Sequence, residues 1–213
     1  ALAAAQYLTG DQPGFEATRT RAGTLFPSSG DLFVTVAEAA VRNRLYREGA
    51  DLAREALVLE PQSWAALASL GQNQLRLGDI DGARQSLEKS FLGDPYNVWV
   101  KNTLDLLDTF VNYTTVPAGN GRFRLFLDKQ EAGVLGPPMG ALATEALEKL
   151  SARYGFSPAD PIRVEAYASH ADFSVRTVGL AGLGALGVCF GPVVAIDSPQ
   201  ARDRGAFNWG STL

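Results

Sequence analysis

The sequence predicts two architectures in one chain, an amino-terminal α-solenoid followed by a small open β-sheet with packed helices. Two observations lead to this α plus α/β fold class. Pro27, Pro61 and Pro95 are spaced 34 residues apart, and a period of this length is typical of stacked helical repeats. Beyond about residue 120, apolar and polar residues alternate, which is the pattern of half-buried strands.

The composition agrees with a folded protein and excludes several classes of function. Of the 213 residues, 46% are hydrophobic, which is enough to bury a sizeable core. The formal net charge is −4, so the chain has no bulk attraction for phosphate backbones or anionic membranes. No uninterrupted apolar run approaches the roughly 20 residues that a membrane span requires. We expect no nucleic acid partner and no membrane span.

The rarest residues limit the chemistry further. The chain has one cysteine, Cys189, and one histidine, His170, whereas zinc sites usually combine three or four ligands of these types and carboxylates. We therefore expect no metal and no cofactor in this chain, and no intrachain disulfide. His170 is expected to be a surface or capping residue at a helix start. Cys189 is expected to be a small buried apolar residue.

Each 34-residue period is expected to contain two amphipathic helices. In the clearest period the apolar positions fit one face of each helix and are Leu67, Leu70 and Leu75, then Ala83, Leu87 and Phe91. The turn Gly78-Asp79 separates the two helices, and Pro95 ends the second because proline cannot continue a helix. Gly10-Asp11 falls in the same register, so the chain opens inside the first helix of a repeat.

A further helix over residues 97–112 is expected to cap the repeats. Its apolar positions form one stripe, made by Val100, Leu104, Leu107 and Val111. A solenoid needs such a segment to cover its last apolar face. We therefore assign residues 1–112 to the repeats with their cap.

The repeats resemble the tetratricopeptide repeat over residues 1–97. The matching positions are the pair Leu70-Gly71, the small residue Ala83 and the terminal Pro95. This resemblance implies that the concave face of the first helices binds a protein or peptide partner. The groove residues that it implies are Val34, Glu38, Val41, Arg42, Ala68, Gln72 and Arg76. The alternative is that the repeats only pack against the rest of the protein.

The second half is expected to follow the order β-α-β-α-β-β after a linker at residues 113–120. Strands are predicted over 123–127 and 162–166, with a helix between them that follows Gly136-Pro137-Pro138. Ser169 and Asp172 have the spacing of a capping box that opens a short helix. Two short strands over about 186–190 and 193–197 complete an open sheet with packed helices.

The segment Gly182–Gly187 satisfies the pattern G-x-G-x-x-G. A dinucleotide site needs a helix at the last glycine, because the helix amino terminus holds the pyrophosphate. Here the following residues are β-branched and are interrupted by Gly191-Pro192, so no helix can begin there. The pattern favours a mobile loop before an edge strand, and nucleotide binding is the weakest of three hypotheses.

Three stretches of the second half resemble a bacterial family of gluzincin-like (peptidase MA-type) peptidases that follow tetratricopeptide repeats. These stretches are residues 164–179, 187–199 and 207–213. In that family the last stretch opens a helix that carries His-Glu-x-x-His. The resemblance implies that residues 121–213 are the amino-terminal part of such a domain, and that a longer parent binds zinc if this motif follows.

The same resemblance implies a surface for substrate. In the family, the substrate backbone lies antiparallel to an edge strand, where main-chain groups supply binding energy. The matching residues are Val193, Val194, Ala195 and Ile196. The alternative is that these residues form an ordinary strand of the sheet.

Two hypotheses for the whole chain follow. The chain lacks an initial methionine and stops where the zinc helix is expected, so the first hypothesis is a catalytically inert segment of a repeat-plus-metallopeptidase protein. The second is an interaction scaffold whose sheet is a pseudo-enzyme or docking domain, without peptidase activity even in the parent. A missing cover would expose Phe190, Val194 and Ile196, so either self-association through the sheet or coverage of that face by the repeats is expected. The sequence does not distinguish a cytoplasmic from a periplasmic location.

Overall fold

The computed structural model describes residues 1–203, 205 and 207–213. The chain divides into two compact units, Ala1–Lys101 and Asn102–Leu213, which we call the repeat unit and the sheet unit. The boundary falls within helix α7 (Val98–Thr109). The predicted fold class is confirmed, because paired antiparallel helices precede an open sheet with packed helices. Within the described residues, no helix has both the length and the apolar character needed to cross a membrane.

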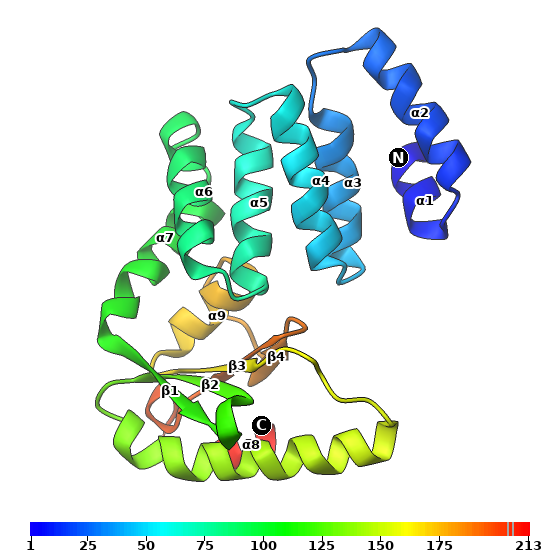
Figure 1. The fold of residues 1–213 in the computed structure, drawn as a ribbon. Helices are drawn as coiled ribbons and strands as arrows, with labels where there is room; N and C mark the ends of the chain where they lie inside the picture. The colour runs from blue at the N-terminus through cyan, green and yellow to red at the C-terminus, as the bar shows by residue number, and fades with distance from the viewer. Residues whose placement is uncertain (204, 206) are drawn as a thin grey trace. The chain divides into compact units, whose positions relative to one another are not determined.

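The repeat unit consists of helices that pack in successive antiparallel pairs (Figure 1). The helices are α1 (Leu2–Thr9), α2 (Gln12–Leu25), α3 (Asp31–Arg42), α4 (Tyr46–Leu59), α5 (Trp64–Arg76) and α6 (Ile80–Gly93). Small residues let the paired helices approach closely. A Cβ atom on Gly71 of α5 would lie 2.6 Å from Leu87 Cγ of α6, so only glycine fits this crossing.

The turn inside each helix pair repeats with the predicted register. Gly10 and Gly78 both adopt a left-handed backbone, with φ of 74° and 85°. Asp11 and Asp79 then cap α2 and α6, each accepting a backbone N–H at 3.0 Å. In the middle pair, Arg44 occupies the glycine position with φ of 61°. Since a side chain disfavours this backbone region, Arg44 is a strained position of the repeat.

Among the described residues the sheet unit contains a five-stranded sheet with the order β1-β2-β3-β5-β4. The strands are β1 (Tyr113–Ala118), β2 (Phe123–Asp128), β3 (Ile162–Tyr167), β4 (Gly187–Cys189) and β5 (Val193–Asp197). Strands β2, β3 and β5 are parallel, and β1 and β4 are antiparallel edge strands. The helices are α8 (Ala132–Tyr154), α9 (His170–Val178) and α10 (Trp209–Thr212).

Helices α8 and α9 cover opposite faces of the sheet (Figure 1). The α8 face is an apolar core, whose buried residues include Leu125, Leu127, Leu135, Met139, Val164, Ala166 and Ile196. The α9 face combines aromatic rings with buried charges. Tyr113 stacks on Phe126 with ring centroids 4.8 Å apart, and Phe110 packs against both rings.

The segment predicted as a linker over residues 113–120 is a strand instead. Strand β1 pairs antiparallel with β2 in full register, from Tyr113 opposite Asp128 to Ala118 opposite Phe123. The linker prediction was wrong because Pro117 and Gly119 indicate a break, whereas β1 lies at the sheet edge. An edge strand tolerates proline, since the missing N–H can face away from the ladder.

The start of the long helix α8 also differs from the prediction. It begins at Ala132, so Pro137 and Pro138 lie inside it rather than before it. Proline removes helical hydrogen bonds. Leu135 and Met139, close to the two prolines, are buried against the sheet, and this packing favours the helix there.

The apolar side chains expected to be exposed by a missing cover are largely buried. Phe190 is 4% exposed and Ile196 is fully buried, while Val194 is half-buried. Ile196 lies in the α8 core, and the guanidinium of Arg176 lies 5.0 Å from the Phe190 ring centroid. The expectation of an exposed sheet face is therefore wrong for these residues. Cys189 is exposed rather than buried.

Candidate functional site

The residues predicted to line a partner groove lie on the first helices α3 and α5, which contact each other. On α3, Glu38 and Arg42 are exposed and Val41 is half-buried. On α5, three predicted residues are half-buried, namely Ala68, Gln72 and Arg76. Val34 differs from the others because it packs in the helical core with 9% of its surface exposed.

The polar side chains of this α3–α5 face interact with their own unit. Arg42 and Glu38 form an exposed ion pair with an N–O distance of 3.9 Å, and pairs of this kind contribute little to stability. Arg76 donates a hydrogen bond to Asn73 at 3.3 Å and lies 5.4 Å from the Tyr46 ring centroid. The face therefore presents both charge signs around the small side chain of Ala68.

The sheet unit brings polar residues together at the carboxyl ends of β3 and β5. The last residues of these parallel strands, Tyr167 and Asp197, are opposite each other in the ladder. Helix α9 begins at His170, just after β3, with Ser169 as the predicted cap: Ser169 Oγ accepts the Asp172 N–H at 3.3 Å. In open α/β sheets this edge is the usual place for ligand sites, so its side chains are a candidate site.

His170, Asp197 and Arg202 form the centre of this cluster. Asp197 is fully buried, and its Oδ2 accepts a hydrogen bond from Arg202 Nε at 2.6 Å. His170 Nδ1 lies 3.0 Å from Asp197 Oδ2 and 2.7 Å from Arg202 Nη2. One guanidinium thus contacts both the carboxylate and the imidazole.

The partners of the His170 ring place a proton on Nε2. Nε2 lies 2.8 Å from the carbonyl oxygen of Leu183, and because a carbonyl can only accept, Nε2 carries a proton and donates it. Nδ1 lies near both the Arg202 guanidinium, which can only donate, and the Asp197 carboxylate, which can only accept.

Ser174 completes a serine, histidine and aspartate set, but its hydrogen bonds are not those of a catalytic triad. Its Oγ lies 3.5 Å from His170 Nε2, donates to the His170 carbonyl at 2.8 Å and accepts the Leu183 N–H at 3.2 Å. A catalytic histidine must accept the serine proton at Nε2, whereas here Nε2 donates to Leu183. Ser174 is also fully buried, so no substrate reaches it in this state.

The cluster instead fixes the glycine-rich segment that precedes β4. Both backbone groups of Leu183 are hydrogen-bonded, the N–H to Ser174 and the carbonyl to His170. Arg202 Nη2 adds a contact of 3.4 Å to the Ala185 carbonyl. The segment predicted as a mobile loop is therefore attached at its middle, and no helix starts at Gly187, where β4 begins.

A second polar cluster lies inside the α9 face of the sheet. Glu165 of β3 is fully buried and accepts hydrogen bonds from Arg163 and Arg176 at 2.7 Å each and from the Tyr167 hydroxyl at 2.9 Å. Burial alone would raise the pKa of Glu165, but the two guanidinium groups outweigh it and lower the pKa. Burial and the Glu165 charge raise the pKa of Tyr167 well above its usual range. Glu165, Tyr167 and Arg176 of this cluster are buried, whereas the Arg163 side chain is 15% exposed.

The residues available in the described part of the chain do not fit a zinc ion. No group of three or more His, Cys, Asp or Glu side chains is arranged there to hold a metal. The nearest approach is His170 with Asp197, where the Arg202 guanidinium already contacts both groups. We derive no zinc-dependent step for this chain.

The strand predicted to bind substrate at an edge is an interior strand. Val193–Asp197 forms β5, which pairs with β3 on one side and with β4 on the other. Its backbone groups are thus committed to the ladder. The neighbouring strand β4 forms the edge of the sheet on this side. The prediction of an edge strand was wrong because β4, which precedes β5 in the chain, pairs with the side of β5 that faces away from β3.

The sequence did not identify most members of the two clusters. Asp197 could have been found, since it is the last residue of the strand predicted over 193–197, and the carboxyl end of that strand meets that of β3. The sequence around Arg202 does not indicate its role, because Arg202 reaches Asp197 only through the path of the chain after β5. Glu165 alternates with the apolar residues of β3, a pattern that gives no sign of its burial, whereas α9 covers that face.

Neither a protein-family model nor a curated protein sequence matches this chain. The tetratricopeptide and gluzincin resemblances therefore remain expectations from the sequence.

Proposed function

We propose that the chain is a protein-interaction module whose repeat unit binds a peptide or protein through the α3–α5 face. The observation that supports this is the composition of the face. Adjacent first helices present exposed Glu38 and Arg42 beside the half-buried Ala68 and Gln72. A small side chain flanked by donors and acceptors of both signs suits an extended peptide, because backbone amides and either charge find partners there.

In this proposal the sheet unit is a non-catalytic docking or pseudo-enzyme domain. Its most conspicuous polar clusters are engaged in internal hydrogen bonds, and Ser174 and Glu165 are buried. The chain itself therefore binds partners and performs no chemistry.

The test is a selection of random peptides on the full chain, followed by affinity measurements on the enriched sequences. Gln72→Arg places a longer charged side chain on the α3–α5 face and is expected to weaken binding at least tenfold. The matched control is Gln85→Arg, at an exposed position of the second helix α6, which should leave the affinity unchanged. Equal affinity in the two variants would show that the peptides bind elsewhere.

A second candidate is that the sheet unit is part of a gluzincin-like peptidase domain in a longer parent. One observation favours it: the outer side of β4 is an unpaired strand edge in the described sheet, and such an edge can add a peptide strand. For this chain we expect no stoichiometric zinc and no peptidase activity, measured by metal analysis and by cleavage of unstructured protein. A His-Glu-x-x-His motif directly after residue 213 in the parent would favour this candidate.

A further inference from the structure

The ends of the second helices expose large apolar side chains at each proline turn of the repeat unit. Leu25 of α2 is 62% exposed, Val58 of α4 is 80% exposed, and Leu92 of α6 is 84% exposed. These turns lie at the same end of the helices (Figure 1). Val58 and Leu92 occupy equivalent positions, 34 residues apart, so the exposure repeats with the architecture. This end of the repeat unit thus presents a surface on which exposed apolar side chains recur.

At the first proline turn this surface is hollowed into a cavity of about 580 Å³. Helices α2, α3 and α4 and the turn between α2 and α3 line it. Its apolar lining consists of Ala22, Phe26, Leu32, Phe33, Val58 and Leu59. The volume lies within the range of ligand pockets, roughly 300–1,000 Å³, and would accept two or three large side chains.

The next repeat differs at the equivalent positions. There the ring of Trp64 at the start of α5 covers Gly93 at the end of α6, where an added Cβ would lie 1.9 Å from a ring atom. The equivalent residues one repeat earlier are Gly30 and Leu59. Gly30 packs closely on α4, where an added Cβ would lie 2.9 Å from the Ala56 carbonyl oxygen, and Leu59 lines the cavity.

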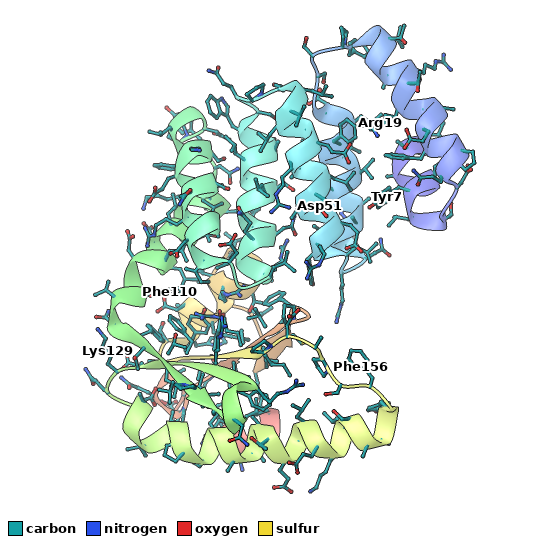
Figure 2. The ribbon with its side chains drawn as sticks, viewed as in Figure 1. Tyr7, Arg19, Asp51, Phe110, Lys129 and Phe156 are labelled. Atoms are coloured by element: carbon teal, nitrogen blue, oxygen red, sulfur yellow. The ribbon has the colours of Figure 1, made fainter. Side chains whose placement is uncertain are left out.

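The charges at the cavity favour a cationic occupant. Three carboxylates, on Glu16, Asp31 and Glu55, line it together with one guanidinium, that of Arg19. Arg19 reaches from α2 towards α3 and α4 (Figure 2), with 3.1 Å to Glu55 and 3.7 Å to Glu16. Its guanidinium lies 5.2 Å from the Phe33 ring centroid. The excess of negative charge complements a positive partner and disfavours an anionic lipid surface.

We propose that this cavity binds a segment of a partner protein in which bulky apolar side chains stand next to lysine or arginine residues. The apolar side chains enter between α2 and α4, beside Val58 and Leu59. The basic side chains pair with the carboxylates at the rim. This site is separate from the α3–α5 face of the proposed function, whose residues do not overlap the lining.

The test uses two labelled synthetic peptides and the full chain. One is an amphipathic peptide of leucine and lysine with a central tryptophan, and the other replaces every lysine with glutamate. We expect the lysine peptide to bind saturably, at least tenfold more tightly than the glutamate peptide, and more weakly as salt is added. Equal binding of the two peptides, or binding of neither, would overturn the proposal.

Two variants locate the binding. Gly23 lies in α2 at the cavity, and a Cβ there meets no atom within 4 Å, so Gly23→Leu adds a side chain at the cavity wall and also favours the helix. The variant should weaken the binding of the lysine peptide at least tenfold. The matched control is Gly133→Leu in α8, where a Cβ also meets no atom. Asp31→Asn should weaken binding several-fold, whereas Asp81→Asn, also in a first helical turn, should not.

The outcome separates this inference from the proposed function. If Gly23→Leu preserves the affinity for the lysine peptide, the inference is wrong, whatever the result at the α3–α5 face. If Gln72→Arg alone weakens that peptide relative to Gln85→Arg, the peptide binds the α3–α5 face and only the proposed function survives. Circular dichroism of Gly23→Leu must show the wild-type helix content, so that a loss of binding reports the side chain added at the cavity wall.

Discussion

Charged side chains lie at the surface of the repeat unit but enter the interior of the sheet unit. The ion pairs of the repeat unit, such as Arg19 with Glu55, are about half exposed on both sides. Among the described residues, the charged side chains that are buried are Glu165, Arg176 and Asp197, and all three belong to the sheet unit. The comparison teaches that the repeats depend on the fit of small and apolar side chains, whereas the sheet also depends on matched charges.

The difference has a geometric origin. Paired helices meet through small residues, as where Gly71 lies against Leu87, and leave every charged side chain a path to water. The sheet is covered on both faces, so polar residues of β3 and β5 that point towards α9 have no such path. Burying a charge is costly unless an opposite charge and hydrogen bonds satisfy it. The clusters around Glu165 and Asp197 meet that condition.

The sharpest test of the comparison removes one charge from the buried cluster. Glu165→Gln leaves the guanidinium of Arg176 buried without its carboxylate partner. We expect the sheet unit to lose about 3–5 kcal/mol of unfolding free energy. Urea unfolding can be followed by the fluorescence of Trp209 in a background in which Trp64 and Trp99 are phenylalanine, since Trp209 is the tryptophan of the sheet unit.

The control for that change is Glu145→Gln. Glu145 pairs with Lys149 on the exposed side of α8, so its loss should leave the unfolding midpoint unchanged. If Glu165→Gln were equally harmless, the buried charges would not be what stabilises the sheet unit.

In the repeat unit a comparable loss of unfolding free energy should come from shortening a buried apolar side chain. Leu87 of α6 is fully buried against α5, and Leu87→Ala is expected to cost about 3 kcal/mol, because the cavity adds to the lost transfer energy. Unfolding can be followed by Trp64 fluorescence with Trp99 and Trp209 replaced by phenylalanine. The exposed Leu92 of the same helix is the control, and Leu92→Ala should have little effect. A similar cost at both positions would contradict the importance of close helix packing.

Acid should destabilise the sheet unit more than the repeat unit. The pKa of Glu165 is lowered in the folded state, below the value of about 4.3 expected in an unfolded chain. Its contribution is therefore fully present above about pH 4.3 and is lost as the pH falls through the lower folded pKa. We expect the stability of the sheet unit to fall below about pH 4, measured by Trp209 fluorescence at a series of pH values. In Glu165→Gln this part of the acid dependence should disappear, and an unchanged slope would assign it to other carboxyl groups.

The smallest expected effect concerns the strained turn of the middle repeat. Arg44 has a left-handed backbone at the position where the neighbouring pairs have Gly10 and Gly78. Arg44→Gly should stabilise the repeat unit by about 0.5–1 kcal/mol, because relief of strain exceeds the added chain entropy. The reciprocal change, Gly78→Ala, should cost about 1 kcal/mol. Both changes in unfolding free energy can be measured by urea unfolding followed by Trp64 fluorescence. If Arg44→Gly destabilised the repeat unit, the contacts of the Arg44 side chain would contribute more free energy than its strained backbone loses.

The sequence predicted much of the fold, and the reasons are local. The recurrence of Pro27, Pro61 and Pro95 and the turns at Gly10 and Gly78 located the helix pairs, because helix ends depend on nearby residues. Strands β2 and β3 followed from alternation, and Ser169 marked the start of α9. The candidate sites were less predictable, because the residues expected on the α3–α5 face include the buried Val34.

The sequence by itself thus determined the 34-residue repeat and the order of strands and helices from β2 to β5, because periodicity and turn residues act over a few positions. Only the tertiary structure decided that β5 is interior, that 113–118 joins the sheet, and that Arg202 meets Asp197 and His170. It also decided where the repeats leave a cavity beside Leu59. These features depend on hydrogen bonds and packing between segments far apart in the chain, and no local pattern encodes which segments meet.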